Sequence, residues 1–335
     1  MRALIYKDAN RLEIEEISLP QCGPGTLLVR VELSGICGSD VSMVKYGMAQ
    51  AGSILGHELI GSIAEIGPGV RGWKQGDKVL VKTRRICGHC AYCKMGKPHL
   101  CDEKSGELGG GYAEYMAVTP DTLMRLPDGL TPERAVLWNP LANALHAWKL
   151  GRFQKGDTAM ILGAGPIGLF VLRAAKLAGA QRTIVSDPAA KRREMAKLFG
   201  ADDALDPTRD DILSEIQVRS PLGSDLVFEC AGKEETLQEA ATYVKRGGQV
   251  VLFGIFMRPI TVIPMLWILK EIDIQAGFGY VDADITDSLD MLLKDSAPLQ
   301  RMITSIILLE RASDTIQKLQ HADEEIKAVI SFLDQ

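Results

Sequence analysis

The sequence lacks the long apolar run of a membrane-spanning helix. Its most apolar stretches, 160–172 and 260–269, are interrupted by glycine or proline before they reach the about 18 apolar residues that a span needs. Basic residues are in the minority, since 38 lysines and arginines stand against 43 acidic residues and give a net charge of -5. We therefore expect no membrane insertion and no nucleic-acid binding, because the latter needs an excess of positive charge.

The sequence also lacks internal repeats, low-complexity tracts and a recognisable secretion signal. Met1 is not followed by the charged and apolar segments of a signal peptide, so we expect a cytoplasmic protein whose cysteines stay reduced. A length of 335 residues with 46% hydrophobic residues is ordinary for a globular protein and suggests two domains.

Four of the seven cysteines are crowded into one short segment. They have the spacing C-x2-C-x2-C-x7-C, at Cys87, Cys90, Cys93 and Cys101. This spacing is typical of four thiolates around one tetrahedral zinc ion, whereas the alternative of disulfides belongs to secreted proteins. The residues between them are polar or turn-forming, which predicts a metal-organised lobe over 84–104 without an apolar core. A closed four-thiolate site leaves no position for a substrate, so this zinc is expected to be structural.

The two halves of the chain differ in their hydrophobic pattern. Up to about residue 125, short apolar runs alternate with glycine turns and predict a mainly β domain. Strands are expected there at 3–6, 27–33, 59–66, 78–81 and 112–118. After about residue 140 the sequence predicts strands that alternate with helices, which is typical of a parallel sheet covered by helices. The strands are expected at 158–162, 183–186, 225–229 and 249–253, and the helices at 169–177, 189–199 and 234–244.

A glycine-rich turn follows the first of these later strands. It reads Gly163-Ala164-Gly165-Pro166-Ile167-Gly168, a G-x-G-x-x-G motif between a strand and a helix. The first glycine permits the tight turn, the second lets the backbone approach a pyrophosphate, and the third lets the helix pack closely. We predict a dinucleotide site here, with Gly163, Gly165, Pro166, Ile167 and Gly168 in contact with the cofactor.

An acidic residue favours one form of the cofactor. Asp187 ends the next strand, at about the 20-residue spacing at which a carboxylate accepts a hydrogen bond from a ribose 2′-hydroxyl. NAD(H) is therefore favoured over NADP(H). Lys191, Arg192 and Arg193 leave NADP(H) open, because a basic side chain there could reach a 2′-phosphate, and Arg192 is included among the cofactor-binding candidates.

A second metal site is indicated in the first half of the chain. Cys37 follows a predicted strand, and His57 and Glu58 precede another, so that a thiolate, an imidazole and a carboxylate could meet at one ion. Each residue alone is more often structural. The combination is what favours a catalytic metal.

Taken together, these motifs resemble the zinc-dependent medium-chain dehydrogenases, nearest to the sorbitol, cyclitol and threonine dehydrogenase branch. The resemblance extends from Met1 to about Phe332. It rests on segments 35–40, 56–58, 67–70, 76–77 and 140–146, on the four-cysteine lobe and on the dinucleotide motif. It implies an α/β fold in which a doubly wound Rossmann domain at 138–274 is inserted into a mainly-β, GroES-like catalytic domain at 1–137 and 275–335, with the active site in a cleft between the two.

The resemblance also implies an activity. An alcohol is oxidised, or a ketone reduced, by hydride transfer at nicotinamide while zinc binds the substrate oxygen, so two zinc ions per chain are expected. Cys37 and His57 would be metal ligands, Asp40 would orient the histidine, and Ser39 would begin a proton relay. The expected substrate is a secondary alcohol of a polyol, cyclitol or amino sugar. A homodimer or homotetramer is also expected, for which the apolar stretch 262–269 offers an edge.

The chain departs from this branch at two positions. Asn139 stands where the branch usually has an acidic zinc ligand, so our hypothesis is that zinc is held by Cys37, His57 and Glu58, with water or substrate as the fourth ligand. Ser42 stands where many relatives have a relay histidine, which predicts a shorter relay through Ser39, water and the cofactor ribose. These changes leave a weakened or vacant catalytic zinc open.

Two other functions remain as alternatives. One is an NADPH-dependent carbonyl reductase of a biosynthetic pathway, and the other is a non-catalytic dinucleotide-binding protein that keeps only the structural zinc. Elsewhere, His146 is expected to pack within a helix, and 302–309 is expected to form an apolar strand rather than part of the site.

Overall fold

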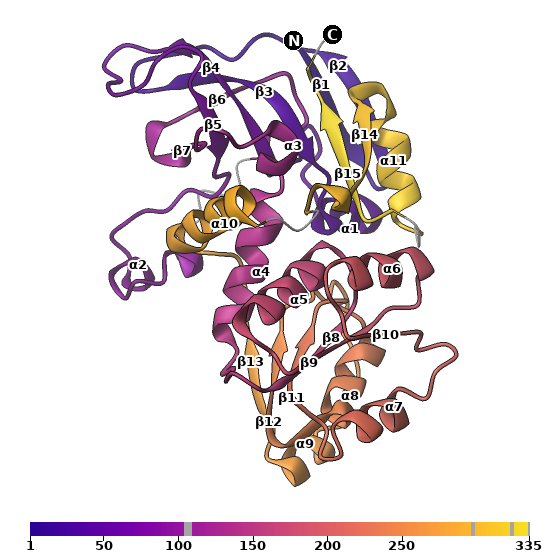
Figure 1. The fold of residues 1–335 in the computed structure, drawn as a ribbon. Helices are drawn as coiled ribbons and strands as arrows, with labels where there is room; N and C mark the ends of the chain where they lie inside the picture. Colours follow the sequence, from indigo (N-terminus) through magenta and orange to yellow (C-terminus); the bar gives the residue numbers. More distant parts are fainter. Residues whose placement is uncertain (104–108, 296–298, 322–324, 334–335) are drawn as a thin grey trace. The chain divides into compact units, whose positions relative to one another are not determined.

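The computed structural model describes residues 1–103, 109–295, 299–321 and 325–333 (Figure 1). The chain forms two compact units, which the following ranges define. Unit 1 comprises Met1–Asn139, Leu289–Asp295 and Ile303–Gln335, and unit 2 comprises Pro140–Ser288 and Ser296–Met302. Helices α4 (Trp138–Leu150) and α10 (Asp282–Lys294) each contribute residues to both units. The domain boundaries at 137/138 and 274/275 stay a prediction.

Unit 1 is built mainly of β-strands, as predicted. A seven-stranded sheet has the order β14-β15-β3-β4-β5-β7, with β6 also paired to β3, and a separate two-stranded sheet joins β1 to β2. The strands are β1 (Arg2–Asp8), β2 (Arg11–Glu16), β3 (Leu27–Gly35), β4 (Glu58–Ile66), β5 (Lys78–Val81), β6 (Tyr115–Val118), β7 (Leu123–Arg125), β14 (Ile303–Leu308) and β15 (Lys327–Ser331). The last strand of the chain therefore lies inside the sheet, next to β3.

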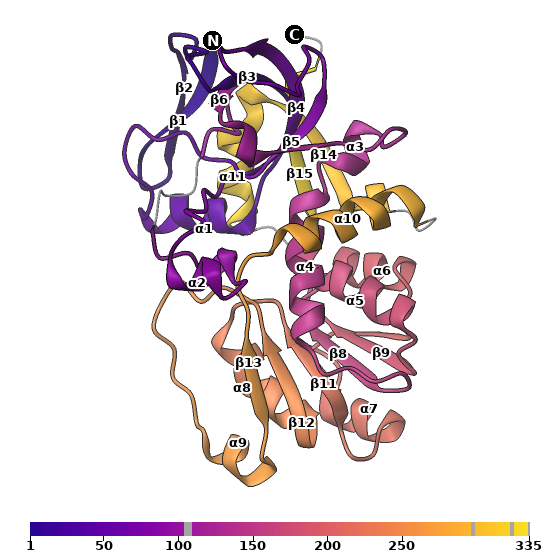
Figure 2. The ribbon, with the colours of Figure 1, turned by 90° about the vertical axis from the view of Figure 1, so that its left-hand side faces the viewer.

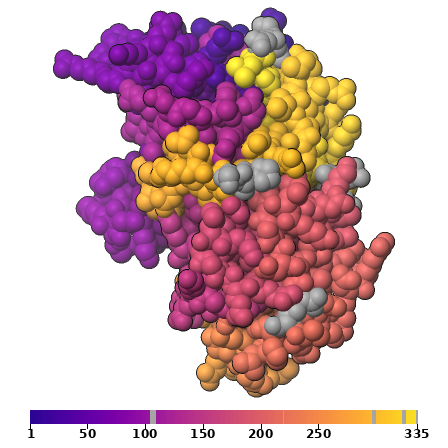
Figure 3. All heavy atoms as spheres, in the orientation of Figure 1, coloured from indigo at the N-terminus to yellow at the C-terminus, as the bar shows by residue number. Residues whose placement is uncertain are grey.

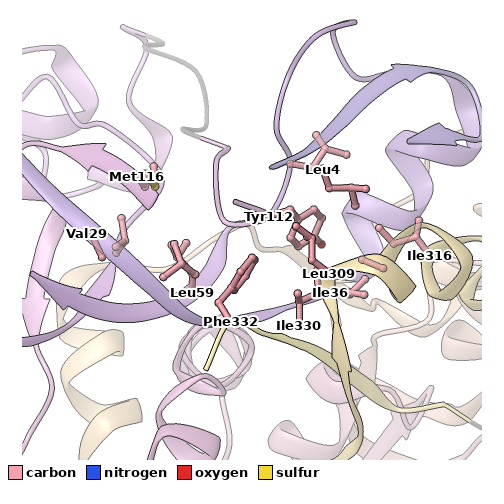
Figure 4. Close-up of a cluster of buried hydrophobic side chains, with 14 of the residues drawn as sticks. Leu4, Val29, Ile36, Leu59, Tyr112, Met116, Leu309, Ile316, Ile330 and Phe332 are labelled. Carbon is pink, nitrogen blue, oxygen red and sulfur yellow. The ribbon is translucent and has the colours of Figure 1, made fainter. Parts of the chain in front are cut away.

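The strand expected at 112–118 begins later, at Tyr115. Tyr112 is fixed by other backbone contacts, since its N–H donates to the carbonyl of Leu55 and its carbonyl accepts from Leu4. These bonds hold Tyr112 in the core of unit 1, where Figure 4 shows it among apolar side chains.

Short helices connect the strands of unit 1. They are α1 (Gly38–Tyr46), α2 (Ala91–Lys94), α3 (Pro132–Ala135) and α11 (Ala312–Leu319), with 3-10 turns η1 (Pro98–Leu100), η2 (Pro120–Thr122) and η4 (Leu309–Arg311). Helix α1 starts directly after β3 and ends at Gly47, whose φ of +67° is the left-handed conformation that suits a glycine at a helix end. The β3–α1 connection therefore places Cys37 just before the first turn of the helix.

Unit 2 contains the predicted parallel sheet. Its six strands have the order β10-β9-β8-β11-β12-β13, and all neighbours are parallel, as Figure 2 shows for β13, β12, β11, β8 and β9. The strands are β8 (Thr158–Leu162), β9 (Arg182–Ser186), β10 (Asp203–Leu205), β11 (Ser224–Glu229), β12 (Val244–Leu252) and β13 (Asp273–Ala276). Successive strands are added on one side of β8 up to β10 and on its other side from β11 onward, as in doubly wound nucleotide-binding sheets.

Helices cover both faces of this sheet. They are α5 (Pro166–Ala178), α6 (Ala190–Leu198), α7 (Ile212–Arg219), α8 (Glu234–Tyr243) and α9 (Met265–Lys270), with the 3-10 turn η3 (Leu299–Met302). Helices α5 and α6 connect β8 to β9 and β9 to β10, toward one edge of the sheet. Helices α8 and α9 connect β11 to β12 and β12 to β13, toward the other edge. Because such crossovers are right-handed, the two groups of helices lie on opposite faces.

Three segments in the second half of the chain can be compared with their predicted structure. The helix expected at 234–244 ends at Tyr243, and the strand expected at 249–253 begins earlier, at Val244, so that Gly247 and Gly248 lie inside β12. The stretch 262–269 is a loop followed by α9, in which Ile263, Met265, Ile268 and Leu269 are exposed. The apolar strand expected at 302–309 is confirmed as β14. Within the described ranges, no helix has the length and apolar character to cross a membrane.

Candidate active site

The four-cysteine lobe brings its thiols together. The sulfur atoms of Cys87, Cys90, Cys93 and Cys101 all lie within 4.8 Å of one another. Neither α2 nor η1, which carry the segment between them, contributes a buried residue. In the space-filling view the lobe forms a knob on unit 1 (Figure 3). The predicted lobe ended at residue 104, which lies outside the described residues.

Backbone amides point at these sulfurs. The N–H of Cys90 donates to the sulfur of Cys87 over 3.2 Å, and the N–H of Cys87 donates to the sulfur of Cys101 over 3.4 Å. Hydrogen bonds from the backbone of Cys93 and Asp102 lower the pKa of Cys90, which favours its thiolate. Four clustered thiols with amide donors and no apolar core fit a structural zinc ion.

The second predicted cluster also forms. Each of its residues offers one ligand atom, and these atoms of Cys37, His57 and Glu58 all lie within 4.8 Å of one another. Sheet register explains the proximity, because Gly35 at the end of β3 is paired with Glu58 at the start of β4. Cys37 follows the first strand and His57 precedes the second, so the two segments meet at the same end of the sheet. A thiol and an imidazole suit Zn²⁺, and three protein ligands with one open position are typical of a catalytic site.

Asp40 holds the imidazole of His57. Its Oδ1 lies 3.3 Å from Nδ1 of His57, and only 1% of the Asp40 surface is exposed. Burial acts to lower the pKa of His57, but the charges of Asp40 and Cys37 outweigh it and raise this pKa well above its usual value. With Nδ1 facing the carboxylate, Nε2 of His57 is the nitrogen left to bind a metal.

Glu58 has a partner that the sequence did not indicate. Its Oε2 forms an ion pair with Nζ of Lys327 from β15, and each side chain is 2% exposed. Lys327 also donates to the carbonyl of Ile36 over 3.0 Å. A Cβ on Gly35 would lie 2.3 Å from Oε2 of Glu58, so a glycine is required beside this pair. No local pattern in the sequence marked Lys327 as the partner of Glu58, from which it is 269 residues away.

Asn139 borders the second cluster. It is 4% exposed, and its Nδ2 donates to the backbone carbonyl of His57 over 3.2 Å. Its amide therefore supports the segment that carries His57. The ligand set of Cys37, His57 and Glu58 stays a prediction, as does the absence of a bond from Asn139 to zinc.

The predicted relay residue lies beside the metal candidate. The hydroxyl of Ser39, in the first turn of α1, donates to the sulfur of Cys37 over 3.2 Å. Ser42 is half-buried on the same helix. The place of Ser39 next to a ligand suits a proton acceptor, and its relay role stays a prediction.

The glycines of the dinucleotide turn have the geometry that their expected roles require. Gly163 has a φ of +95°, which permits the turn after β8. A Cβ on Gly165 would meet nothing within 4 Å, which leaves space for a pyrophosphate, whereas a Cβ on Gly168 would lie 1.9 Å from the carbonyl oxygen of Gly163. Pro166 and Ile167 begin α5, whose first amides can face an anion.

Asp187 follows β9, as predicted, and its carboxylate also organises the turn. Its Oδ2 accepts from the N–H of Ala164 over 2.8 Å, and its Oδ1 accepts from the N–H of Ala189 over 2.9 Å. Arg192 lies at 3.9 Å from Oδ2 of Asp187. Arg193 is tied to the backbone of Asp187 and to Asp206, with distances of 2.8 and 2.9 Å. Arg193 is therefore bound into the fold.

Sequence reasoning missed Glu229 at the end of β11. This fully buried carboxylate accepts from the N–H groups of Ala231 and Gly232 over 2.9 and 2.8 Å, and burial raises its pKa. Ala231 would contact a side chain on Gly163, so Glu229 shapes the loop that faces the dinucleotide turn. His146, by contrast, lies in helix α4 as expected, and its Nδ1 is 2.8 Å from Asp284 of α10.

The fold and these clusters define a class of protein, namely an oxidoreductase with a dinucleotide-binding sheet and clustered side chains that could bind zinc. Comparisons with known proteins agree. Residues 23–128 match the family described as alcohol dehydrogenase GroES-like domain, and residues 166–294 match the family described as zinc-binding dehydrogenase.

Individual relatives span most of the chain. Sorbitol dehydrogenase of Bacillus subtilis is 31% identical over 98% of this chain and 97% of its own. L-threonine 3-dehydrogenase of Pyrococcus horikoshii is 35% identical over 75% of this chain and 74% of its own. A solved structure of a provisionally assigned zinc-binding dehydrogenase from Sinorhizobium meliloti 1021, bound to NADP, has a TM-score of 0.90 at 30% identity and covers 98% of both chains.

The chain belongs to the zinc-dependent medium-chain alcohol dehydrogenase family. The predicted family and enzyme class are thereby confirmed. It is a zinc alcohol dehydrogenase that uses a nicotinamide cofactor and acts on a small alcohol.

Proposed function

We propose that this enzyme interconverts a secondary alcohol of a polyol, cyclitol or amino sugar and the corresponding ketone, with NAD(H) as cofactor and two zinc ions per chain. The observation that carries the proposal is the second cluster, in which Cys37, His57 and Glu58 offer ligand atoms within 4.8 Å. The sorbitol dehydrogenase of Bacillus subtilis supports a polyol, and the L-threonine 3-dehydrogenase of Pyrococcus horikoshii supports a substrate that carries an amino group.

The residues of the cluster have distinct parts in this proposal. When bound, zinc would polarise the oxygen of the substrate and nicotinamide would accept or return a hydride. Cys37 and His57 would hold the metal, and Asp40 would keep the proton on Nδ1 of His57 so that Nε2 stays free. Ser39 would accept the hydroxyl proton of the substrate at its Oγ while it passes its own hydroxyl proton on to water and the cofactor ribose. Glu58 is the third proposed ligand, and Lys327 offsets its charge.

Metal analysis tests the second site. We expect near two zinc ions per chain in the wild-type protein and near one in Cys37→Ala, which should keep cofactor binding and lose turnover. Cys22→Ala is the matched control, because Cys22 also lies in unit 1 and its thiol donates to the backbone carbonyl of Thr26. A wild-type protein with one zinc, retained in Cys37→Ala, would leave the four-cysteine lobe as the metal site and refute the proposal.

The preference for NAD(H) rests on Asp187. This 3% exposed residue directly follows β9, where its carboxylate would accept from a ribose 2′-hydroxyl and repel a 2′-phosphate. Arg192 nearby, and the NADP bound to the Sinorhizobium meliloti relative, favour the second candidate, an NADPH-dependent carbonyl reductase. Titration with NADH and NADPH separates the two, since tighter binding of NADPH would favour the reductase.

A substrate panel tests the alcohol. We expect NADH to appear with one of a set of polyols and aminocyclitols, while L-threonine and simple primary alcohols serve as comparisons. Turnover of L-threonine above every polyol would contradict the proposed substrate and favour a threonine dehydrogenase activity instead.

We further propose a cytoplasmic homodimer or homotetramer. Metal-binding thiols need a reducing compartment. In unit 2, β13 is an edge strand, and α9 with its preceding loop exposes Ile263 (63%), Met265 (63%), Ile268 (73%) and Leu269 (60%). Apolar side chains beside an open edge suit self-association. Light scattering at a monomer mass would contradict it, and Ile268→Glu should weaken the assembly.

A further inference from the structure

The hydroxyl group of Tyr112 lies in the core of unit 1, beside the buried carboxylate of Asp40. Tyr112 is fully buried, and Figure 4 shows its ring near Leu4, Ile36 and Leu309. The hydroxyl donates to Oδ2 of Asp40 over 2.7 Å. Burial and the charge of Asp40 raise the pKa of Tyr112 well above its usual value, so the phenol keeps the proton that it donates.

This contact continues toward the metal candidate. Asp40 uses Oδ2 for Tyr112 and places Oδ1 at 3.3 Å from Nδ1 of His57. The carboxylate of Asp40 therefore lies between the hydroxyl of Tyr112 and the imidazole of His57, and all three residues belong to unit 1. A buried carboxylate that orients a ligating histidine needs its own orientation fixed, because a rotated carboxylate would present its oxygen at a different angle.

The fold leaves Tyr112 little freedom to move. Its backbone is held by Leu55 and by Leu4, over 3.0 and 2.9 Å. Its ring packs against Gly56, where a Cβ would lie 2.5 Å from Cδ1 of the ring. Gly56 directly precedes His57, so the segment that carries the histidine is shaped to the ring whose hydroxyl reaches Asp40.

We propose that Tyr112 is a positioning residue for the metal centre: its hydroxyl fixes Asp40, which in turn aims Nε2 of His57 at the ion. The inference rests on the proposed metal site at Cys37 and His57. It predicts that the hydroxyl, rather than the ring, contributes to metal retention, because removing it leaves the buried Oδ2 of Asp40 without this donor.

Zinc retention tests the proposal. Tyr112→Phe keeps the ring and removes only the hydroxyl. Loss of an outer partner of a metal ligand costs about 10- to 100-fold in affinity, and we expect about tenfold for a contact one residue further out. The measurement is zinc affinity of the second site by competition with a chromophoric chelator, with the zinc of the four-cysteine lobe as an internal reference. Tyr6→Phe is the matched control, since Tyr6 is 2% exposed in the same core cluster.

A double-mutant cycle separates positioning from general loss of stability. In the Asp40→Asn background, Tyr112→Phe should weaken zinc binding by less than about twofold, because its effect passes through the carboxylate. The shift in unfolding temperature on adding zinc to metal-free protein gives a second readout in which any general destabilisation cancels. If Tyr112→Phe binds zinc like the wild type, or costs the same tenfold without the Asp40 carboxylate, positioning is refuted. A wild-type chain with only one zinc would overturn the metal site itself.

Discussion

Lys327 and Glu58 form an ion pair that is almost completely removed from water, with each side chain 2% exposed. Two opposite charges can be buried only together, since either one alone would retain the full cost of its lost hydration. Lys327 donates to the carbonyl of Ile36 as well, so its ammonium group has two partners.

We expect Lys327→Met to lower the free energy of unfolding by about 3–5 kcal/mol, because it leaves the carboxylate of Glu58 buried without its partner. Urea denaturation of metal-free protein measures the change. The double variant Glu58→Gln with Lys327→Met should recover part of the loss. A single variant within about 1 kcal/mol of the wild type would mean that the pair is not important for stability.

These residues mark what the sequence can predict at this scale. Cys37, His57 and Asp40 could be named because each lies in a recognisable short motif. Lys327 and Tyr112 could not, since their partners lie 269 and 72 residues away in the chain and only the fold brings them together. No local pattern distinguishes a buried lysine with a partner from an exposed one.

At the scale of elements, Lys270, the last residue of α9, caps the C-terminal end of the neighbouring helix α8. Its Nζ donates to the carbonyls of Ala241, Thr242 and Val244 at the end of α8, over 2.9, 2.7 and 2.8 Å. The last carbonyls of a helix have no partners within the helix and carry a partial negative charge. The ammonium group of Lys270 thus supplies the hydrogen-bond donors that the carbonyls at the end of α8 lack.

Lys270→Met should destabilise the protein by about 1.5–3 kcal/mol, the range for hydrogen bonds to a charged group. Lys294→Met is the control, because Lys294 also ends a helix but pairs with Asp290 at the surface, and its loss should stay within about 0.5 kcal/mol. Equal effects of the two variants in urea denaturation would contradict the assigned capping role.

Helices α4 and α10 are joined in unit 2 by a charged cluster. Asp284 is 1% exposed and contacts His146 at 2.8 Å and Lys149 at 2.7 Å. Burial acts to raise the pKa of Asp284, but hydrogen bonds with His146 and Lys149 lower it from 3.8 to about 2. Because the folded state holds this proton more weakly than the unfolded state, stability is present above pH 3.8 and falls as the pH drops toward about 2.

Asp284→Asn should remove that part of the acid dependence. We expect the free energy of unfolding of the variant to change less than that of the wild type between pH 4 and pH 2, a window set by the shift from 3.8 to about 2. Urea denaturation at a series of pH values measures it. Asp290→Asn, which removes a surface partner of Lys294, should follow the wild-type curve. Parallel curves for all three proteins would rule out the assignment.

Helices and strands could be predicted from the sequence where a segment had one clear hydrophobic pattern. The apolar run 158–162 forms β8 with the predicted bounds, because a strand covered on both faces needs no polar alternation. The strand expected at 112–118 was too long, since backbone bonds to Leu55 and Leu4 hold Tyr112 outside β6. Such bonds depend on distant segments and leave no local pattern.

At the scale of the whole molecule, the four-cysteine lobe differs from the rest of the chain in what holds it together. The two units have buried apolar clusters, whereas α2 and η1 of the lobe bury none of their residues. Its order should therefore depend on the metal.

Removal of zinc by a strong chelator should unfold the lobe locally. We expect amide hydrogen exchange over 87–101 to accelerate more than 100-fold, while the strands β8, β11 and β12 of unit 2 keep their protection. Cys93→Ser should show the same local pattern without chelator. Uniform loss of protection through unit 2 would show instead that the lobe stabilises the whole chain.

The position of β15 has a consequence for how the protein is made. This strand lies between β14 and β3 and carries the lysine that neutralises Glu58, yet Lys327 follows Glu58 by 269 residues in the chain. During synthesis, the segments with Cys37 and His57 are therefore available long before the charge beside them can be balanced. The ion pair beside the proposed metal site can therefore form only after those 269 residues have been synthesised, so a nascent chain has its candidate zinc ligands before it has the charge that balances Glu58.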